Sequence, residues 1–215
     1  MKVMIHACPS RLWYVDRFLA PSLREQGLEP IVWNDAEGYG CLESCLRSFD
    51  AGLADWHIQD DVLICRDFAE KIKDLDGVVA GFCHSRFGDD PQCVGKIYPP
   101  DLWHGFPCVR IPVDMAREFV RWVKGTRHTD HGAIYNLRHN KGDDYLFRLF
   151  FNTVHQYDTA TNIPLVEHVD YLIGGSTVSE WRGYWCRNDL WTDEALVDEL
   201  REKLNTITRP LPINR

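Results

Sequence analysis

The sequence predicts a single α/β domain with a mostly parallel central sheet flanked by helices. Short apolar segments near residues 3, 31 and 57 alternate with two segments of helical periodicity, 13–26 and 42–53. Parallel strands need a helical crossover between them, so this alternation is typical of a Rossmann-related sheet. The chain has 215 residues and 45% hydrophobic content, enough for one full core. We therefore expect one domain over residues 1–208 and a loosely held tail over 209–215.

The first half of the chain has the clearest element boundaries. In order, we expect a strand at 3–5, a helix at 13–26, a strand at 30–33, a helix at 42–53 and a strand that begins at 56. Gly27 ends the first helix, since glycine is favoured just after the last helical turn. The second helix places Leu46, Phe49 and Leu53 on one apolar face.

The second half is interrupted by two polar segments, 84–106 and 125–142, which are long for loops of a compact domain. Around them we expect a helix at 68–73, strands at 77–83 and 107–111, helices at 112–123 and 143–154, an extended segment at 163–169 and a helix at 192–204.

Asp60 and Asp61 end the apolar segment that begins at Trp56. Ionised side chains are rarely buried unless they are paired or bind a metal, so two acids at a strand end indicate a cation or a polar ligand there. A turn that is simply acidic is the alternative reading. In a parallel sheet this pair would lie at the edge where ligands bind.

Composition excludes several classes of protein. The net charge of −8 argues against binding duplex nucleic acid mainly through its phosphates, although 110–148 holds eight Lys and Arg against five acids. The eight cysteines are scattered and form no C-x-x-C pair. No apolar stretch is long enough for a signal peptide or a membrane span, so we expect a soluble cytoplasmic protein.

The absence of several known motifs excludes further classes of enzyme. The chain has no Walker glycine loop, no G-x-G-x-x-G, no G-x-S-x-G and no H-x-E with C-x-x-C. These absences argue against nucleoside triphosphatases, Rossmann dehydrogenases, α/β-hydrolases and zinc deaminases.

Three segments together resemble the nucleotide-sugar glycosyltransferases of the GT-A fold, in particular small bacterial or bacteriophage-type members. They are Gln59-Asp60-Asp61-Val62, Gly142-Asp143-Asp144, and Pro164-Leu165-Val166-Glu167-His168. The resemblance implies a divalent metal, Mn²⁺ or Mg²⁺, held on the donor diphosphate by Asp61 and His168. Asp60 would lie beside the metal and position the donor, and Gln59, at the first position of the D-x-D-like motif, is a further donor-binding candidate.

The same resemblance implies roles for other residues. Asp143 or Asp144 would face the acceptor and take its hydroxyl proton. The donor nucleotide, UDP before other nucleotides, would lie at the loops after the first two strands, whose candidate residues are His6, Ala7, Ser10, Arg11, Asn34 and Asp35. The acceptor is open between a glycan, a protein and a modified nucleic-acid base.

Other readings of these residues stay open. An aspartate at a helix start can be only an N-cap, and a lone histidine beside valines is often structural. The four aspartates at 60, 61, 143 and 144 also suit a two-metal phosphohydrolase or nuclease. A non-catalytic binding module is the remaining alternative. The sequence does not choose the sugar or the stereochemical course.

Overall fold

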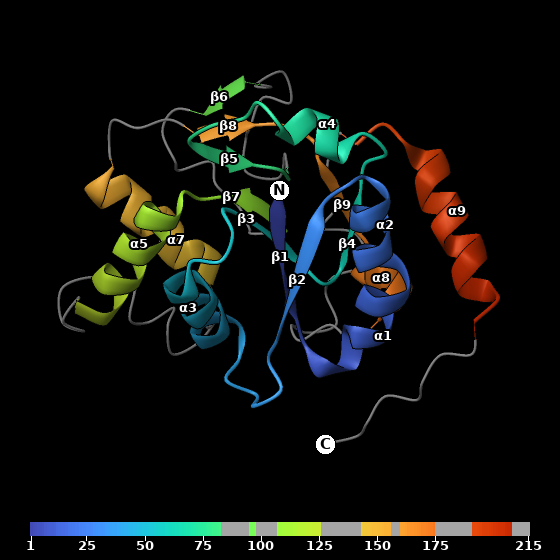
Figure 1. The fold of residues 1–215 in the computed structure, drawn as a ribbon, viewed down its shortest axis with the longest axis horizontal. Coiled ribbons are helices and arrows are strands. Elements are labelled where there is room, and N and C mark those ends of the chain that lie inside the picture. The colour runs from blue at the N-terminus through green and yellow to red at the C-terminus, as the bar shows by residue number, and fades with distance from the viewer. Residues whose placement is uncertain (83–94, 98–106, 126–142, 156–159, 175–190, 208–215) are drawn as a thin grey trace.

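The structure is a computed structural model that describes residues 1–82, 95–97, 107–125, 143–155, 160–174 and 191–207. Its main sheet has the order β2-β1-β3-β7-β5-β8-β6 among these residues. The strands are β1 (Lys2–Ala7), β2 (Glu29–Asn34), β3 (Trp56–Gln59), β5 (Val78–Ala80), β6 (Gly95–Ile97), β7 (Cys108–Arg110) and β8 (Ala160–Asn162). Figure 1 shows the sheet through the middle of the molecule with helices on both sides.

The sheet is mixed and largely parallel, which confirms the α/β class. Strands β1, β2, β3, β5 and β8 run in one direction, while β7 and β6 run against their neighbours. The strand expected at 107–111 is present as β7, but it lies antiparallel between β3 and β5. No described helix separates β5 from β7 in the chain, and a strand that returns without a helical crossover pairs antiparallel.

A second, two-stranded sheet lies beside the main one. It pairs β4 (Val62–Ile64) with β9 (Val166–His168) in antiparallel register, with Val62 opposite His168. The expected third strand is therefore split, since β3 ends at Gln59 and β4 starts three residues later in another sheet. Asp60 and Asp61 form the turn between them, and the β4–β9 register places His168 next to that turn.

The helices divide between two faces (Figure 1). Helices α1 (Leu12–Tyr14) and α2 (Ala20–Glu25) pack with Val3, Ile5 and Trp56 in one buried cluster. The other cluster contains residues of α3 (Cys41–Ala51), α5 (Val113–Gly125) and α7 (Asp143–Val154). The remaining helices are α4 (Phe68–Ile72), α8 (Asp170–Ile173) and α9 (Glu194–Asn205).

The connection from β1 to β2 thus runs over one face, and α3 returns over the other face to β3, on the far side of β1. The strand order therefore reverses at β1, because β2 lies on one side of it and β3 on the other. In open α/β sheets such a point is where ligands bind.

The first expected helix is broken into pieces. A 3-10 turn (Pro9–Arg11) leads into α1, a π-helical turn (Val15–Leu19) follows, and α2 completes the segment. Pro21 has no N–H to donate to the preceding turn, which accounts for the wider turn before it. Gly27, at φ 77°, ends the segment as expected.

Helix α3 is shorter than expected and ends at Gly52, at φ 60°. Leu53 lies beyond it and is 47% exposed, so its predicted place on the buried face is wrong. The helix at 192–204 is confirmed as α9, capped by Asp193, whose Oδ1 accepts from the Leu196 N–H at 3.0 Å. Strand β8 and helix α8 were not anticipated, and neither was β6, which lies within the expected loop at 84–106.

Some expectations lie outside the described residues: most of 84–106, residues 126–142, and the tail from 209. Within the described part of the chain, no helix has the length and apolar character needed to cross a bilayer.

Candidate functional site

Asp60 and Asp61 are buried at the carboxyl edge of the main sheet, 4% and 2% exposed. They lie in the turn between β3 and β4, where the chain passes from one sheet to the other. Two adjacent carboxylates at this depth need compensating charge or hydrogen bonds. The structure supplies both from distant parts of the chain.

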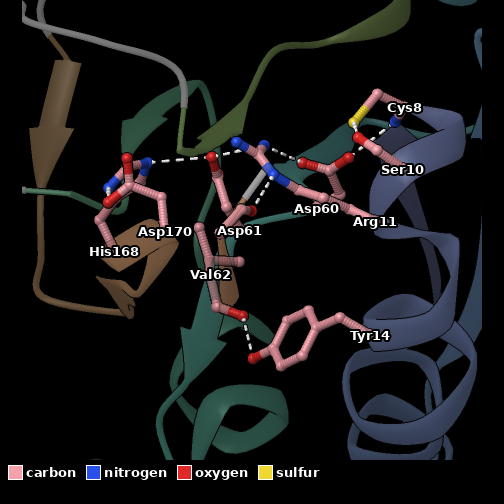
Figure 2. A network of polar contacts seen from close by, with 10 residues as sticks. Cys8, Ser10, Arg11, Tyr14, Asp60, Asp61, Val62, His168 and Asp170 are labelled. Atoms are coloured by element: carbon pink, nitrogen blue, oxygen red, sulfur yellow. Dashed lines mark hydrogen bonds and ion pairs between the residues drawn. The ribbon is translucent and has the colours of Figure 1, made fainter. Parts of the chain in front are cut away.

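Arg11 joins the two carboxylates, as Figure 2 shows. Its Nη1 donates to Oδ1 of Asp60 and to Oδ2 of Asp61, both at 2.7 Å, and its Nε donates to the Gly174 carbonyl at 3.2 Å. The backbone N–H of Cys8 donates to Oδ2 of Asp60 at 2.7 Å. Both oxygens of Asp60 are therefore engaged by the loop that follows β1.

Arg11 itself is 4% exposed, and its Nη2 has no hydrogen-bond partner in the described part of the chain. A buried donor without a partner costs roughly 1–3 kcal/mol. Nη2 is thus the part of the guanidinium that the described residues leave unsatisfied.

His168 reaches the site from the end of β9. Its Nε2 lies 3.2 Å from Oδ2 of Asp61, and its Nδ1 lies 3.3 Å from Oδ1 of Asp170. His168 and Asp170 are each 3% exposed. The imidazole is therefore held between two buried carboxylates, with Nε2 directed to the acidic turn (Figure 2).

These charges shift one another's protonation. Burial alone lowers the pKa of His168, but the carboxylates of Asp61 and Asp170 outweigh it and raise that pKa to about 10. Burial raises the pKa of Asp60, although Arg11 opposes the change. Burial would lower the pKa of Arg11, yet Asp61 and Asp60 raise it above its ordinary value. In this structure the cluster is a network of ion pairs.

The geometry also suits a divalent cation. Adjacent ligands of an octahedral Mg²⁺ or Mn²⁺ are about 3 Å apart, close to the separation of the Asp61 and His168 atoms. A carboxylate on the far ring nitrogen, as Asp170 provides, is the usual support of a metal-binding histidine. Among the described residues, no group of three or more His, Cys, Asp or Glu side chains is arranged to hold a metal ion.

Tyr14 of α1 holds the start of β4, next to the acidic turn. Its hydroxyl donates to the Val62 carbonyl at 2.9 Å, and its ring is 1% exposed. Burial raises the pKa of Tyr14, which keeps the hydroxyl protonated as a donor. The first helical segment therefore positions β4 directly.

The donor-site candidates lie around the same edge in different environments. Ser10 is exposed, with its Oγ 3.1 Å from Sγ of Cys8. Asn34 is exposed, while Ala7 is buried and its carbonyl accepts from the Asp35 N–H at 2.8 Å. Gln59 is partly buried at the end of β3. Ala7, Asn34 and Gln59 are thus the last residues of three neighbouring strands, and Ser10 lies in the turn after β1.

Asp35 has a local role. Its two carboxylate oxygens accept from the N–H groups of Tyr39 and Gly40, at 2.9 and 2.8 Å. Its carboxylate thus holds the turn before α3, as aspartates at turns commonly do.

His6 belongs to a separate hydrogen-bonded group. Its Nε2 lies 2.9 Å from Nδ1 of His57 and 3.4 Å from Oγ of Ser48. This group lies on the α3 side of β1, since the His6 ring packs edge-on against Phe49 of α3.

Asp143 and Asp144 begin α7, as expected for a helix start at that position. Their side chains lie outside what the structure describes. The expected acceptor-facing role therefore stays a prediction.

Sequence reasoning missed two parts of this site. Asp170 follows His168 by two residues, and that short spacing between a histidine and an acid was the available signal. The Cys8 N–H carries no signal in the sequence, because a backbone donor is the same at every residue except proline.

Comparison with known proteins gives no family assignment. The chain matches no protein-family model, and no curated protein shows significant sequence similarity to it. Its function is therefore argued from the site.

Proposed function

We propose that this protein is a metal-dependent glycosyltransferase with a GT-A-like domain, which moves a sugar from a nucleoside diphosphate, UDP before others, to a hydroxyl acceptor. The observation that carries the proposal is the contact between Asp61 and His168. Two side chains of metal-binding type meet, one from the turn between β3 and β4 and one from β9, at the carboxyl edge of the sheet. That edge is where an α/β sheet binds nucleotides.

In this proposal Asp61 and His168 hold Mn²⁺ or Mg²⁺, which supplies Lewis-acid stabilisation of the diphosphate leaving group. Such stabilisation is needed here. A carboxylate 4 Å from a phosphate oxygen repels it by roughly 4 kcal/mol per charge pair at an effective dielectric constant of 20. His168 must be deprotonated to bind a cation.

The other residues of the cluster act on these two. Arg11 holds Asp61 in place and keeps Asp60 ionic, while Asp170 fixes the ring of His168. Nη2 of Arg11, which is buried and has no hydrogen-bond partner among the described residues, is proposed to donate to an oxygen of the donor. Asp143 or Asp144 is proposed to take the acceptor proton, an effect commonly worth about 10²–10⁴ in rate.

The phosphohydrolase alternative fits less well. Two-metal sites need several carboxylate oxygens for ions about 3.5–4 Å apart. Both oxygens of Asp60 are already engaged, by Arg11 and by the Cys8 N–H. A metal on Asp60 would have to displace Arg11 or the Cys8 N–H, whereas a metal on Oδ2 of Asp61 would compete with Arg11 alone.

A purely structural reading also fits less well. Buried ion pairs contribute little net stability compared with apolar residues of the same volume. Arg11, Asp60, Asp61, His168 and Asp170 are all nearly inaccessible. A cluster this charged is an inefficient way to close a turn, which favours a functional role.

The proposal is tested by incubating the protein with a panel of UDP-sugars and Mn²⁺ and measuring UDP and free sugar released, with and without added acceptors. A transferase releases UDP in an Asp61-dependent and acceptor-stimulated reaction, whereas a phosphohydrolase releases phosphate or UMP. The variant is Asp61→Asn. The matched control is Asp55→Asn. Asp55 also pairs with an arginine, Arg110, but it lies just before the start of β3, at the opposite end of that strand from Asp61. UDP release that Asp61→Asn leaves unchanged would contradict the proposal.

A further inference from the structure

One backbone carbonyl at the start of β4 faces away from its partner strand β9. The Val169 N–H donates to the Asp61 carbonyl at 2.8 Å, and the Cys65 N–H donates to the Leu165 carbonyl at 3.0 Å. Backbone bonds between antiparallel strands involve alternate residues, so the residue after Asp61 forms a pair without backbone bonds to the residue opposite it. That residue is Val62, whose carbonyl therefore points away from β9.

Tyr14 is the partner of this carbonyl. Its hydroxyl, at the end of α1, donates to the Val62 oxygen at 2.9 Å (Figure 2). Val62 is 0% and Tyr14 1% exposed, so bulk water does not reach the bond. Without the hydroxyl, the carbonyl would be buried and unsatisfied, or β4 would move until another donor reached it.

Val62 lies between the two candidate metal ligands. Asp61 precedes it in the chain, and His168 is opposite it in the small sheet. In a pair of this kind the Cα atoms are only about 4.5 Å apart and the side chains are close neighbours. A movement of Val62 therefore changes the separation of Oδ2 of Asp61 and Nε2 of His168, which is 3.2 Å in this structure.

Gln26 holds the other end of β4 in a similar way. Its Nε2 donates to the Cys65 carbonyl at 3.0 Å, and its Oε1 accepts from the Ala69 N–H at 3.0 Å. Gln26 directly follows α2, so side chains of one helical segment bond to the chain at both ends of β4. The Gln26 bond lies at the end of the strand that is remote from Asp61.

The π-helical turn at Val15–Leu19 allows both contacts. In an unbroken α-helix, two side chains with the sequence separation of Tyr14 and Gln26 point about 120° apart around the axis. A π turn takes up one residue more than an α turn, which reduces this angle to about 20°. Turns of this type are frequent at functional sites. The turn thus directs Tyr14 and Gln26 to the same strand.

We propose that Tyr14 is a positioning residue of the candidate metal site, whose hydroxyl sets the distance between Asp61 and His168 through Val62. This inference rests on the proposed function and adds a residue outside the candidate ligands. Support of a metal ligand by its neighbours is typically worth about 10–100-fold in metal affinity. Because Tyr14 acts through the backbone of an intervening residue, we expect a contribution of about three- to tenfold.

The experiment compares Tyr14→Phe with Gln26→Met. Tyr14→Phe removes only the hydroxyl and keeps the ring, which stacks on Phe18. Gln26→Met removes the bond at the other end of β4 and keeps a side chain of similar length. Urea unfolding measures the stability of each variant, and electron paramagnetic resonance of unbound Mn²⁺, with UDP present, measures its metal affinity.

We expect both variants to fold and both to be less stable than the wild type, since each loses a bond to β4. Only Tyr14→Phe should bind Mn²⁺ more weakly, by at least about threefold, while Gln26→Met keeps the affinity of the wild type. This difference separates positioning of the ligands from a general loosening of the strand.

Wild-type Mn²⁺ affinity in folded Tyr14→Phe would overturn this inference and leave the proposed function standing. An equal loss of affinity in both variants would do the same, because the effect would then not depend on the end of β4 that Tyr14 holds. A wild type that binds no Mn²⁺ in the presence of UDP would overturn both.

Discussion

Nε2 of His168 lies 3.2 Å from Oδ2 of Asp61, although the two residues come from distant parts of the chain. The contact depends on the antiparallel pairing of β4 with β9, which sets Val62 opposite His168. Asp170 approaches the same ring from its other nitrogen. The candidate metal site is therefore built by the small second sheet as much as by the main one.

Replacing Asp170 is expected to weaken metal binding. Asp170→Asn removes the carboxylate beside Nδ1 of His168, and loss of such support typically costs 10–100-fold in metal affinity. Electron paramagnetic resonance of unbound Mn²⁺, with UDP present, measures the affinity directly. Asp74→Asn is the matched control, because Asp74 is exposed. Equal affinity in the wild type and Asp170→Asn would contradict a positioning role for Asp170.

Arg11 is expected to be essential for stability. Arg11→Met leaves Asp60 and Asp61 buried without their cation, and breaking a buried pair from one side costs about 3–5 kcal/mol. Arg11→Lys keeps the charge but loses the Nε bond to the Gly174 carbonyl and the fixed planar geometry, so its loss of stability should be smaller. Urea unfolding monitored by circular dichroism gives both values. A change below about 1 kcal/mol for Arg11→Met would show that the acids do not depend on the guanidinium.

The histidine pair is expected to make the fold sensitive to acid. The folded-state pKa of His6, about 4, lies below its ordinary value of 6.5, and that of His57 is lowered as well. The unfolded chain therefore binds protons first as pH falls. Stability should decrease from about pH 6.5 down to about pH 4 through these groups. Urea unfolding at several pH values measures the slope, which should be shallower over this window in a double variant, His6→Gln with His57→Gln. If the wild type and the double variant had the same slope of stability against pH, the conclusion that both histidines are neutral in the folded protein would be contradicted.

Gly81 is expected to tolerate no side chain. A Cβ there would lie 2.5 Å from Sγ and 2.8 Å from Cβ of Cys108, and the Gly81 carbonyl accepts from the N–H groups of Leu165 and Val166, which lead into β9. Gly81→Ala should cost about 1–3 kcal/mol through overpacking and should also weaken metal binding by displacing β9. At Gly125 a Cβ meets nothing within 4 Å, so Gly125→Ala is the control. Equal stability of the two variants would contradict the close approach.

Local patterns in the sequence identified most elements. Apolar runs and helical periodicity located β1, β2, β3, α3 and α9, and Gly27 marked the end of a helix. The direction of β7 was not readable, because strand direction depends on the connection and not on the strand's own residues. Strand β8 has only three residues, too few to show an alternating pattern.

Part of the site was also predictable from local patterns in the sequence. Acids at a strand end and a histidine after an apolar segment are local signals, and the structure does bring Asp61 and His168 together. The clamp by Arg11 was not foreseen, since it depends on how the loop after β1 folds over the turn. For Asp35 the same local signal did not lead to the site. This acid also follows a strand, but its carboxylate accepts hydrogen bonds from the backbone of its own turn.

The most direct test of the proposed function is calorimetric titration with UDP, with and without Mn²⁺, on the wild type and on Asp61→Asn. Asparagine keeps the shape of the side chain, and a thermal unfolding scan confirms that the variant is folded. The account predicts binding that requires both Mn²⁺ and Asp61. Binding that is equally tight without the metal or without the Asp61 carboxylate, or no binding of UDP by the folded wild type, would contradict it.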